Sequence, residues 1–162
     1  MPNESNHNAY LLPVDVDGAQ TELCLPISKL YQELNDLKAN HTVVFMDACF
    51  SGAQRGNGIL TNARSVALKV KNDTPQGNMV VFTAATGDQT AFPYTEKHHG
   101  MFTYFLLKKL QETSGEATLS EIGNYISEQV SQQVAIEKGR KQTPLIIPSV
   151  TYSGNWKETK LK

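Results

Sequence analysis

Two short runs of β-branched and aromatic residues constrain the fold more than any other feature of this sequence. Residues 42–46 (Thr-Val-Val-Phe-Met) and 79–84 (Met-Val-Val-Phe-Thr-Ala) show no alternation of apolar and polar positions. Continuous runs of this kind are typical of strands that are buried on both faces, as in a parallel sheet covered by helices. The sequence therefore predicts two central strands of an α/β fold.

Helix-forming patterns flank these two runs. Apolar residues recur at helical spacing from Ile27 to Leu37, after Pro26, which suits a first helical turn. Residues 101–110 form a strongly apolar helical segment. Thr118-Leu119-Ser120-Glu121 has the pattern of a capping box. The helix that this box opens carries a single apolar stripe, made of Leu119, Ile122, Ile126, Val130 and Val134.

Two further short strands are expected. Residues 9–14 read as a strand end or hairpin arm, and residues 145–147 as a last strand. Pro144 and Pro148 limit that last strand and favour an edge position for it, since proline cannot complete a hydrogen-bond ladder. Strands that alternate with helices predict a three-layer α/β/α architecture with a mainly parallel sheet.

Length and charge exclude several classes of protein. The 162 residues suit one domain, which we place at residues 1–150, followed by a polar tail at residues 151–162. The net charge is −1, so no global field attracts nucleic acid or an anionic membrane. No apolar run approaches the roughly 20 residues that span a bilayer. Residues 1–8 lack the features of a signal peptide, and the compartment stays open.

The chain has two cysteines, Cys24 and Cys49. This number is too small for a disulfide scaffold. A bridge between them is formally possible, but each lies in an apolar run, where free thiols are common. We therefore expect both to be thiols.

Polar residues follow both predicted central strands. Asp47 and Cys49 follow the first strand, with Ser51-Gly52 directly after, whereas Thr86, Asp88 and Gln89 follow the second. Ligands of open α/β sheets bind beyond the carboxyl ends of the strands, so both groups are expected at one edge. A pocket with the two carboxylates would prefer a cation. The Cys49 thiol can serve as a nucleophile once a base generates the thiolate.

Two other interpretations of Cys49 stay open on the residues alone. The thiol can be a buried structural one, as most cysteines are. Cys49 and Arg55 also have the Cys-x5-Arg spacing with which cysteine phosphatases hold a phosphate. However, Ala48 stands where those enzymes usually have His, and Gly56 where they usually have Ser or Thr.

Four motifs, taken together with their order along the chain, resemble those of the caspase-domain peptidases of bacteria. These peptidases are relatives of metacaspases in the caspase/gingipain clan. The strongest is Asp-Ala-Cys-Phe-Ser-Gly at residues 47–52. The likeness extends to about Pro148. The other three are Tyr-Leu-Leu-Pro-Val-Asp at 10–15, Phe-Thr-Ala-Ala-Thr-Gly-Asp-Gln-Thr-Ala at 82–91 and Gly-Met-Phe-Thr-Tyr-Phe-Leu-Leu at 100–107.

The resemblance implies a peptidase whose substrate is a protein or peptide. Cys49 matches the nucleophile, and Asp47 and Asp88 match the two acids that line the S1 pocket and favour Arg or Lys at P1. No cofactor is implied, and no matched cluster supports the calcium activation known for some metacaspases. The region 51–78 resembles a segment that is cleaved on activation. Basic residues that suit autocleavage there are Arg55, Arg64, Lys69 and Lys71.

The chain departs from the family pattern at the general base. The family's His lies in a Ser/Ala-Gly-His-Gly motif just before the 10–15 strand, and no such motif occurs here. His7 lacks the flanking glycines. His98-His99-Gly100 looks similar but is expected to end a loop, and His41 is expected at the surface or an edge.

We therefore expect the chain to be the C-terminal two-thirds of a caspase fold, incomplete at the N-terminal side of the sheet. The partner His would come from an upstream segment. An open strand edge would then pair with that segment or with another chain. The alternative is a caspase-like scaffold or binding module without catalysis.

Overall fold

The computed structural model describes most of the chain outside its N-terminal end and one long central region. The ranges described are 9–13, 15–16, 20–48, 74–87, 89–152, 154 and 156–162. The sequence also suggests a short strand near residues 66–70, a segment that lies outside these ranges.

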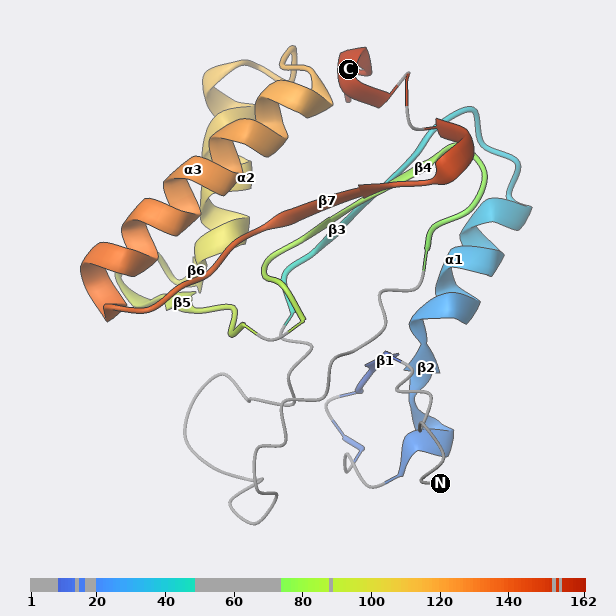
Figure 1. Cartoon of the computed structure of the whole chain (residues 1–162), viewed down its shortest axis with the longest axis horizontal. Coiled ribbons are helices and arrows are strands. Elements are labelled where there is room, and N and C mark those ends of the chain that lie inside the picture. Colours follow the sequence, from blue (N-terminus) through green and yellow to red (C-terminus); the bar gives the residue numbers. More distant parts are fainter. Residues whose placement is uncertain are drawn as a thin grey trace, which may run out of the picture.

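A three-stranded sheet forms the centre of the fold (Figure 1). Its strands are β3 (Thr42–Met46), β4 (Met79–Thr83) and β7 (Leu145–Pro148), in the order β3-β4-β7. β3 runs parallel to β4, and β7 runs antiparallel to β4. The prediction of both central strands and of an edge strand near 145–147 is confirmed. The sheet is mixed, since β7 reverses direction.

One sequence expectation for β3 is wrong. All of β4 is buried, but in β3 only Met46 is, and residues 42–45 are half-buried. β4 covers one edge of β3, and no strand pairs with its other edge within the described ranges. A continuous apolar run therefore predicted the strand correctly but not its burial, which depends on neighbours distant in sequence.

Helices cover both faces of the sheet, which gives the predicted three layers (Figure 1). α1 (Ile27–Asp36) lies on one face. α2 (Met101–Glu112) and α3 (Leu119–Lys138) pack together on the other. The capping box is present: the Glu121 amide donates to Thr118 Oγ1 at 3.2 Å, and the Thr118 amide donates to Glu121 Oε2 at 2.8 Å.

Successive residues of β4 point to opposite faces and supply two separate cores. Val80 and Phe82 belong to a large cluster with α2 and α3, which contains the predicted α3 stripe. Met79 and Val81 belong to a smaller cluster with α1. This alternation follows from the two-residue period of a strand.

Gly123 marks the closest approach of α3 to the sheet. A Cβ atom at this position would collide with Ile146 Cδ1 of β7 and would lie 3.1 Å from Phe82 Cε1 of β4. The absence of a side chain therefore lets the helix backbone settle directly on the strands.

Short elements complete the fold. β1 (Tyr10–Leu11) pairs antiparallel with β2 (Leu25–Pro26), which confirms the hairpin arm expected at 9–14. β5 (Pro93–Tyr94) pairs with β6 (His99–Gly100) around the 3-10 turn η2 (Thr95–Lys97). Two other turns are η1 (Thr21–Leu23) and η3 (Val150–Tyr152).

The segment after residue 150 packs against the body of the domain. Trp156, which opens the 3-10 turn η4 (Trp156–Glu158), is buried and contacts the Phe82 ring edge-on at 6.4 Å between centroids. The Leu119 amide donates to the Thr159 carbonyl at 2.8 Å. The C-terminal segment thus provides a hydrogen-bond acceptor for the first amide of α3. Among the described helices, none is long and apolar enough to cross a membrane.

Candidate active site

Of the three residues predicted to form the site, the structure describes Asp47. Cys49 and Asp88 lie outside the described ranges, as do His7 and the basic residues expected to suit autocleavage. The geometry of the site is therefore built from Asp47 and the described residues around it.

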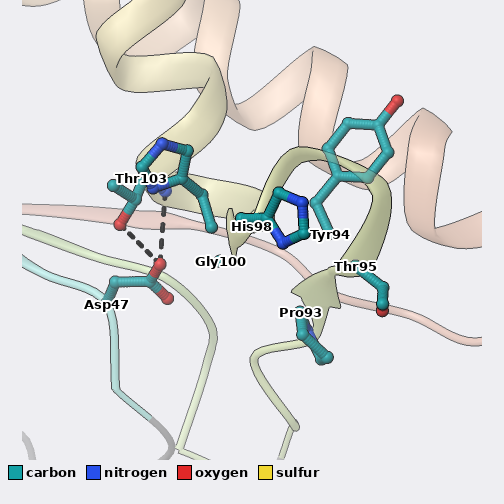
Figure 2. A pocket seen from close by; sticks show the side chains of 8 residues that line it. Asp47, Pro93, Tyr94, Thr95, His98, Gly100 and Thr103 are labelled. Carbon is teal, nitrogen blue, oxygen red and sulfur yellow. Dashed lines mark hydrogen bonds between the residues drawn. The ribbon is translucent and has the colours of Figure 1, made fainter.

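Asp47 follows β3 directly and is half-buried. Its Oδ2 atom accepts two hydrogen bonds from one residue of α2, Thr103 (Figure 2). The Thr103 hydroxyl donates at 2.6 Å and the Thr103 amide at 3.3 Å. Both bonds are charge-assisted when the carboxylate is ionised, and such bonds are stronger than neutral ones. The carboxylate is thus fixed in position.

The Thr103 contact also satisfies the start of α2. The N-cap residue of this helix is Gly100, which has no side chain with which to cap it. The first amides of a helix lack partners within the helix, and its positive end favours a negative charge. Asp47, from a strand on the sheet, takes the place of an N-cap side chain. The same two bonds hold the carboxylate and cap the first turn of the helix.

A pocket of about 580 Å³ opens beside this carboxylate. Figure 2 places Asp47 at one side of it, and Tyr94, Thr95 and His98 at the other. No Lys or Arg occurs among the described residues that line it. The described residues that line it are Asp47, Pro93, Tyr94, Thr95, His98, His99, Gly100 and Thr103.

The two histidines of the pocket belong to the β5–β6 hairpin. His98 ends η2 in the left-handed conformation, with φ 55°, and His99 opens β6. This confirms the expectation that His98-His99-Gly100 ends a loop. Both side chains are exposed. Sequence analysis did not predict that this loop would lie beside Asp47.

His41 has a structural contact elsewhere. Its Nδ1 lies 2.6 Å from the hydroxyl oxygen of Tyr152, and the two rings stack with centroids 5.5 Å apart. His41 is exposed and directly precedes β3, which confirms the expected surface position.

The loop after β4 carries Thr86 and Gln89, which were expected at the same edge of the sheet as Asp47. Neither is among the described residues that line the pocket. The Oε1 atom of Gln89 instead accepts the amide of Thr143 at 2.6 Å, so this side chain holds the loop to the segment before β7.

Metal and disulfide chemistry find little support in the described part of the chain. No group of three or more His, Cys, Asp or Glu side chains there is placed to hold a metal ion. Cys24 is a free, half-buried thiol, and its Sγ donates to the Gln20 carbonyl at 3.5 Å. The expectation of a free thiol is confirmed for Cys24.

Comparison with known families identifies the fold. The family model described as the caspase domain matches residues 3–152. No curated protein matches the chain. The family match agrees with the α/β layers of the fold. Since it covers nearly the whole sequence, the chain belongs to the caspase domain family, a family of cysteine peptidases that act on proteins.

Proposed function

We propose that this protein is an endopeptidase that cleaves after Arg or Lys, with Cys49 as the nucleophile and Asp47 and Asp88 as the acids of the S1 pocket. The observation that carries the proposal is the fixed carboxylate of Asp47. It stands two residues before Cys49 in the chain and beside a pocket whose described lining contains no basic Lys or Arg.

A fixed carboxylate suits the recognition of a guanidinium or ammonium group. Carboxylate–guanidinium pairs are strong when the partners are pre-organised, because little rotamer freedom is lost on binding. Thr103 provides that pre-organisation through its two bonds to Oδ2. A basic side chain in the pocket would meet the Asp47 carboxylate at the pocket wall.

The reaction follows from the chemistry of a thiol. A histidine base takes the Cys49 proton, and Sγ attacks the carbonyl carbon after Arg or Lys. Backbone amides stabilise the negative oxygen of the tetrahedral intermediate. The C–N bond breaks, and the departing amine takes the proton from the histidine. Water then attacks the thioester, releases the new carboxylate and restores the thiol.

The source of the histidine base is part of the proposal. β3 pairs with β4 along one edge only, within the described ranges. Unpaired strand edges readily bind another strand. We propose that a polypeptide segment paired with this edge of β3 supplies the base. His98 and His99 are the alternative within the chain, because they line the pocket with Asp47.

The test is a panel of peptide reporters that differ only at P1: Arg, Lys and citrulline, the last being a neutral analogue of Arg. Wild-type protein, with the His-bearing segment supplied, should cleave the basic reporters and not the citrulline one. Cys49→Ala should abolish cleavage. Asp47→Asn should lower kcat/KM for Arg by roughly 100-fold, as expected when a partly desolvated charge partner is lost.

Asp36→Asn is the matched control, because Asp36 is an exposed carboxylate at the end of α1. It should cleave like wild type. Full activity of the His98→Asn/His99→Asn double variant would favour a base from outside the pocket, whereas its inactivity would favour these residues. Failure of the complemented wild-type protein to cleave any basic reporter would support the scaffold alternative.

A further inference from the structure

A second pocket adjoins the Asp47 pocket. It has a volume of about 500 Å³ and shares one described residue, His99, with the Asp47 pocket. Lys97 and His99 of the β5–β6 hairpin form one side of it, and α2 forms the other. Because Lys97 and Lys108 both line it, we call it the lysine pocket.

The α2 side of the lysine pocket is one face of the helix. Residues three and four positions apart share a helix face, and the α2 residues of the pocket have this spacing, at positions 104, 107, 108, 111 and 112. Leu107 on this face is 47% exposed. The buried residues of α2 are others, namely Met101, Phe102, Phe105 and Leu106. The pocket face of α2 is therefore open to solvent.

An aromatic ring connects the two pockets. Tyr104 of the lysine pocket packs edge-on against Tyr94, which lines the Asp47 pocket, with 4.9 Å between centroids. Tyr104 also meets Phe105 edge-on at 5.1 Å. The ammonium of Lys97 lies 5.9 Å from the centroid of the Tyr104 ring, within the range of a cation–π interaction. Tyr104 thus holds a positive charge over the lysine pocket.

The described linings of the two pockets have opposite charge. Asp47 gives its pocket a negative charge, whereas two lysines against one glutamate give the lysine pocket a positive one. Lys108 Nζ lies 3.9 Å from Glu112 Oε1, in a pair whose side chains are 42% and 52% exposed. Exposed pairs of this kind contribute little free energy. Lys108 can therefore exchange Glu112 for the carboxylate of a ligand at little cost.

The spacing of the pockets fits one extended peptide. Thr103, which holds Asp47, is five residues from Lys108 on α2, or about 7.5 Å along the helix axis. An extended chain advances about 3.3–3.6 Å per residue. A peptide whose basic side chain lies at Asp47 would therefore bring a residue about two to four positions away to the lysine pocket.

We propose that the lysine pocket is a second substrate-binding site, which takes an acidic side chain of the same peptide whose basic side chain binds at Asp47. This inference rests on the proposed role of Asp47 in recognising a basic side chain. Lys97 and Lys108 bind the acidic group, and Tyr104 and Leu107 contact its methylene groups. The preferred substrates carry an acidic residue about two to four positions from the basic one.

Benzamidine, a small aromatic cation, tests the Asp47 pocket by itself, and benzamide serves as its neutral analogue. Wild-type protein should bind benzamidine and not benzamide, as measured by NMR titration. The double variant Lys97→Gln/Lys108→Gln should bind benzamidine within about twofold of wild type, because neither lysine is among the described residues that line the Asp47 pocket.

Two pairs of peptides test the lysine pocket by NMR titration of the full chain with Cys49→Ala, which prevents cleavage. One pair is acetyl-Glu-Ala-Ala-Arg-Ala-Ala-amide and its Gln counterpart. The other is acetyl-Ala-Ala-Arg-Ala-Ala-Glu-amide and its Gln counterpart, which place the acid on the other side of the arginine. In one of the pairs, the Glu peptide should bind about fivefold more tightly, as expected for two partly exposed charge pairs. This preference should decline between about 0.01 M and about 1 M salt, which screens exposed charges.

Three variants in the same background assign the preference for Glu to the lysine pocket. Lys97→Gln/Lys108→Gln should remove it. Glu112→Gln should raise it by about twofold, because Lys108 loses a competing carboxylate. Lys29→Gln is the matched control and should leave it unchanged. Lys29 also forms an exposed pair with a glutamate four positions on, Glu33 at 3.8 Å, but it lines neither pocket.

The outcomes distinguish the two levels of the argument. If wild type binds benzamidine no better than benzamide, the role of Asp47 fails, and the pairing of the two pockets fails with it. If benzamidine binds but the Glu and Gln peptides bind equally in both pairs, only the role of the lysine pocket is overturned. A preference for Glu that survives the double lysine variant, or that does not increase with Glu112→Gln, would also overturn it.

Discussion

The two faces of the sheet differ in what they carry. The face covered by α2 and α3 contains the larger core and carries Thr103, the α2 residue that fixes the carboxylate of Asp47. The face covered by α1 contains the smaller core and no residue of the described pocket. We infer that the first face couples stability to function and that the second provides support alone.

The largest expected effect comes from Phe82→Ala on the first face. Phe82 is 1% exposed, packs on Phe45 at 4.9 Å between ring centroids and meets the edge of Trp156. Truncation should lower the free energy of unfolding by about 3–5 kcal/mol, as for other buried aromatic residues. Urea denaturation measures this loss. A loss below about 1 kcal/mol would show that this core relaxes freely.

Val80 and Val81 offer a matched pair that tests the comparison directly. Both are fully buried neighbours on β4, but Val80 faces α2 and α3 whereas Val81 faces α1. Each change to Ala should cost about 1–3 kcal/mol in urea denaturation, with the larger cost at Val80, where two helices limit relaxation. Benzamidine affinity should fall for Val80→Ala alone. Equal losses of affinity would remove the distinction between the faces.

Thr103→Val tests the hydrogen bond that connects Asp47 to α2, on the first face of the sheet. The change keeps the shape of the side chain but removes the hydroxyl that donates to Oδ2 at 2.6 Å. We expect a loss of about 1–2 kcal/mol in unfolding free energy, since a bond to a charged group is lost. Benzamidine affinity should fall with it. Thr103→Ser, which keeps the hydroxyl, should restore most of the affinity; no restoration would contradict the positioning of Asp47.

The smallest effect is expected at the capping box of α3. Thr118→Ala removes a side-chain cap and should cost about 1 kcal/mol. The hydrogen bond from the Thr118 amide is the main cause that holds the pKa of Glu121 below its ordinary value of 4.5, with the Thr118 hydroxyl second. A lowered folded-state pKa contributes stability above pH 4.5 that is lost as the pH falls through the folded value.

Comparison of wild type with Glu121→Gln in urea denaturation checks this sign. The wild type should have the larger free energy of unfolding at pH 6. This difference from the variant should shrink as the pH is lowered to 3. Benzamidine affinity should not change at pH 7, because the box lies at the start of α3, away from the pocket. A difference in unfolding free energy that grows on acidification would contradict the lowered pKa of Glu121.

The sequence predicted the elements well because their signals are local. The apolar run at 42–46 matches β3, and the Thr118 pattern marks the first turn of α3. Family resemblance likewise followed from contiguous motifs, and the family match confirms its coarser part, the caspase domain. The burial of β3 was missed, because it depends on which strands lie beside it.

The contacts that organise the site had no local signal. Thr103 and Asp47 are 56 positions apart. In the sequence, Thr103 is an ordinary polar position of an apolar helix. A faint indication was Gly100 at the start of α2, where no side chain can cap the helix and a distant one must.

The most direct test of the central claim is covalent trapping by a peptidyl-arginine acyloxymethyl ketone. The adduct is read by mass spectrometry of peptides from the full chain, in the presence of the proposed His-bearing segment. The account predicts an adduct at Cys49 and none at Cys24, the free thiol that serves as internal control. The adduct should be strongly reduced by Asp47→Asn and absent with the citrulline analogue. Labelling of both cysteines alike, or equal labelling by the two reagents, would contradict the proposed nucleophile and its acidic pocket.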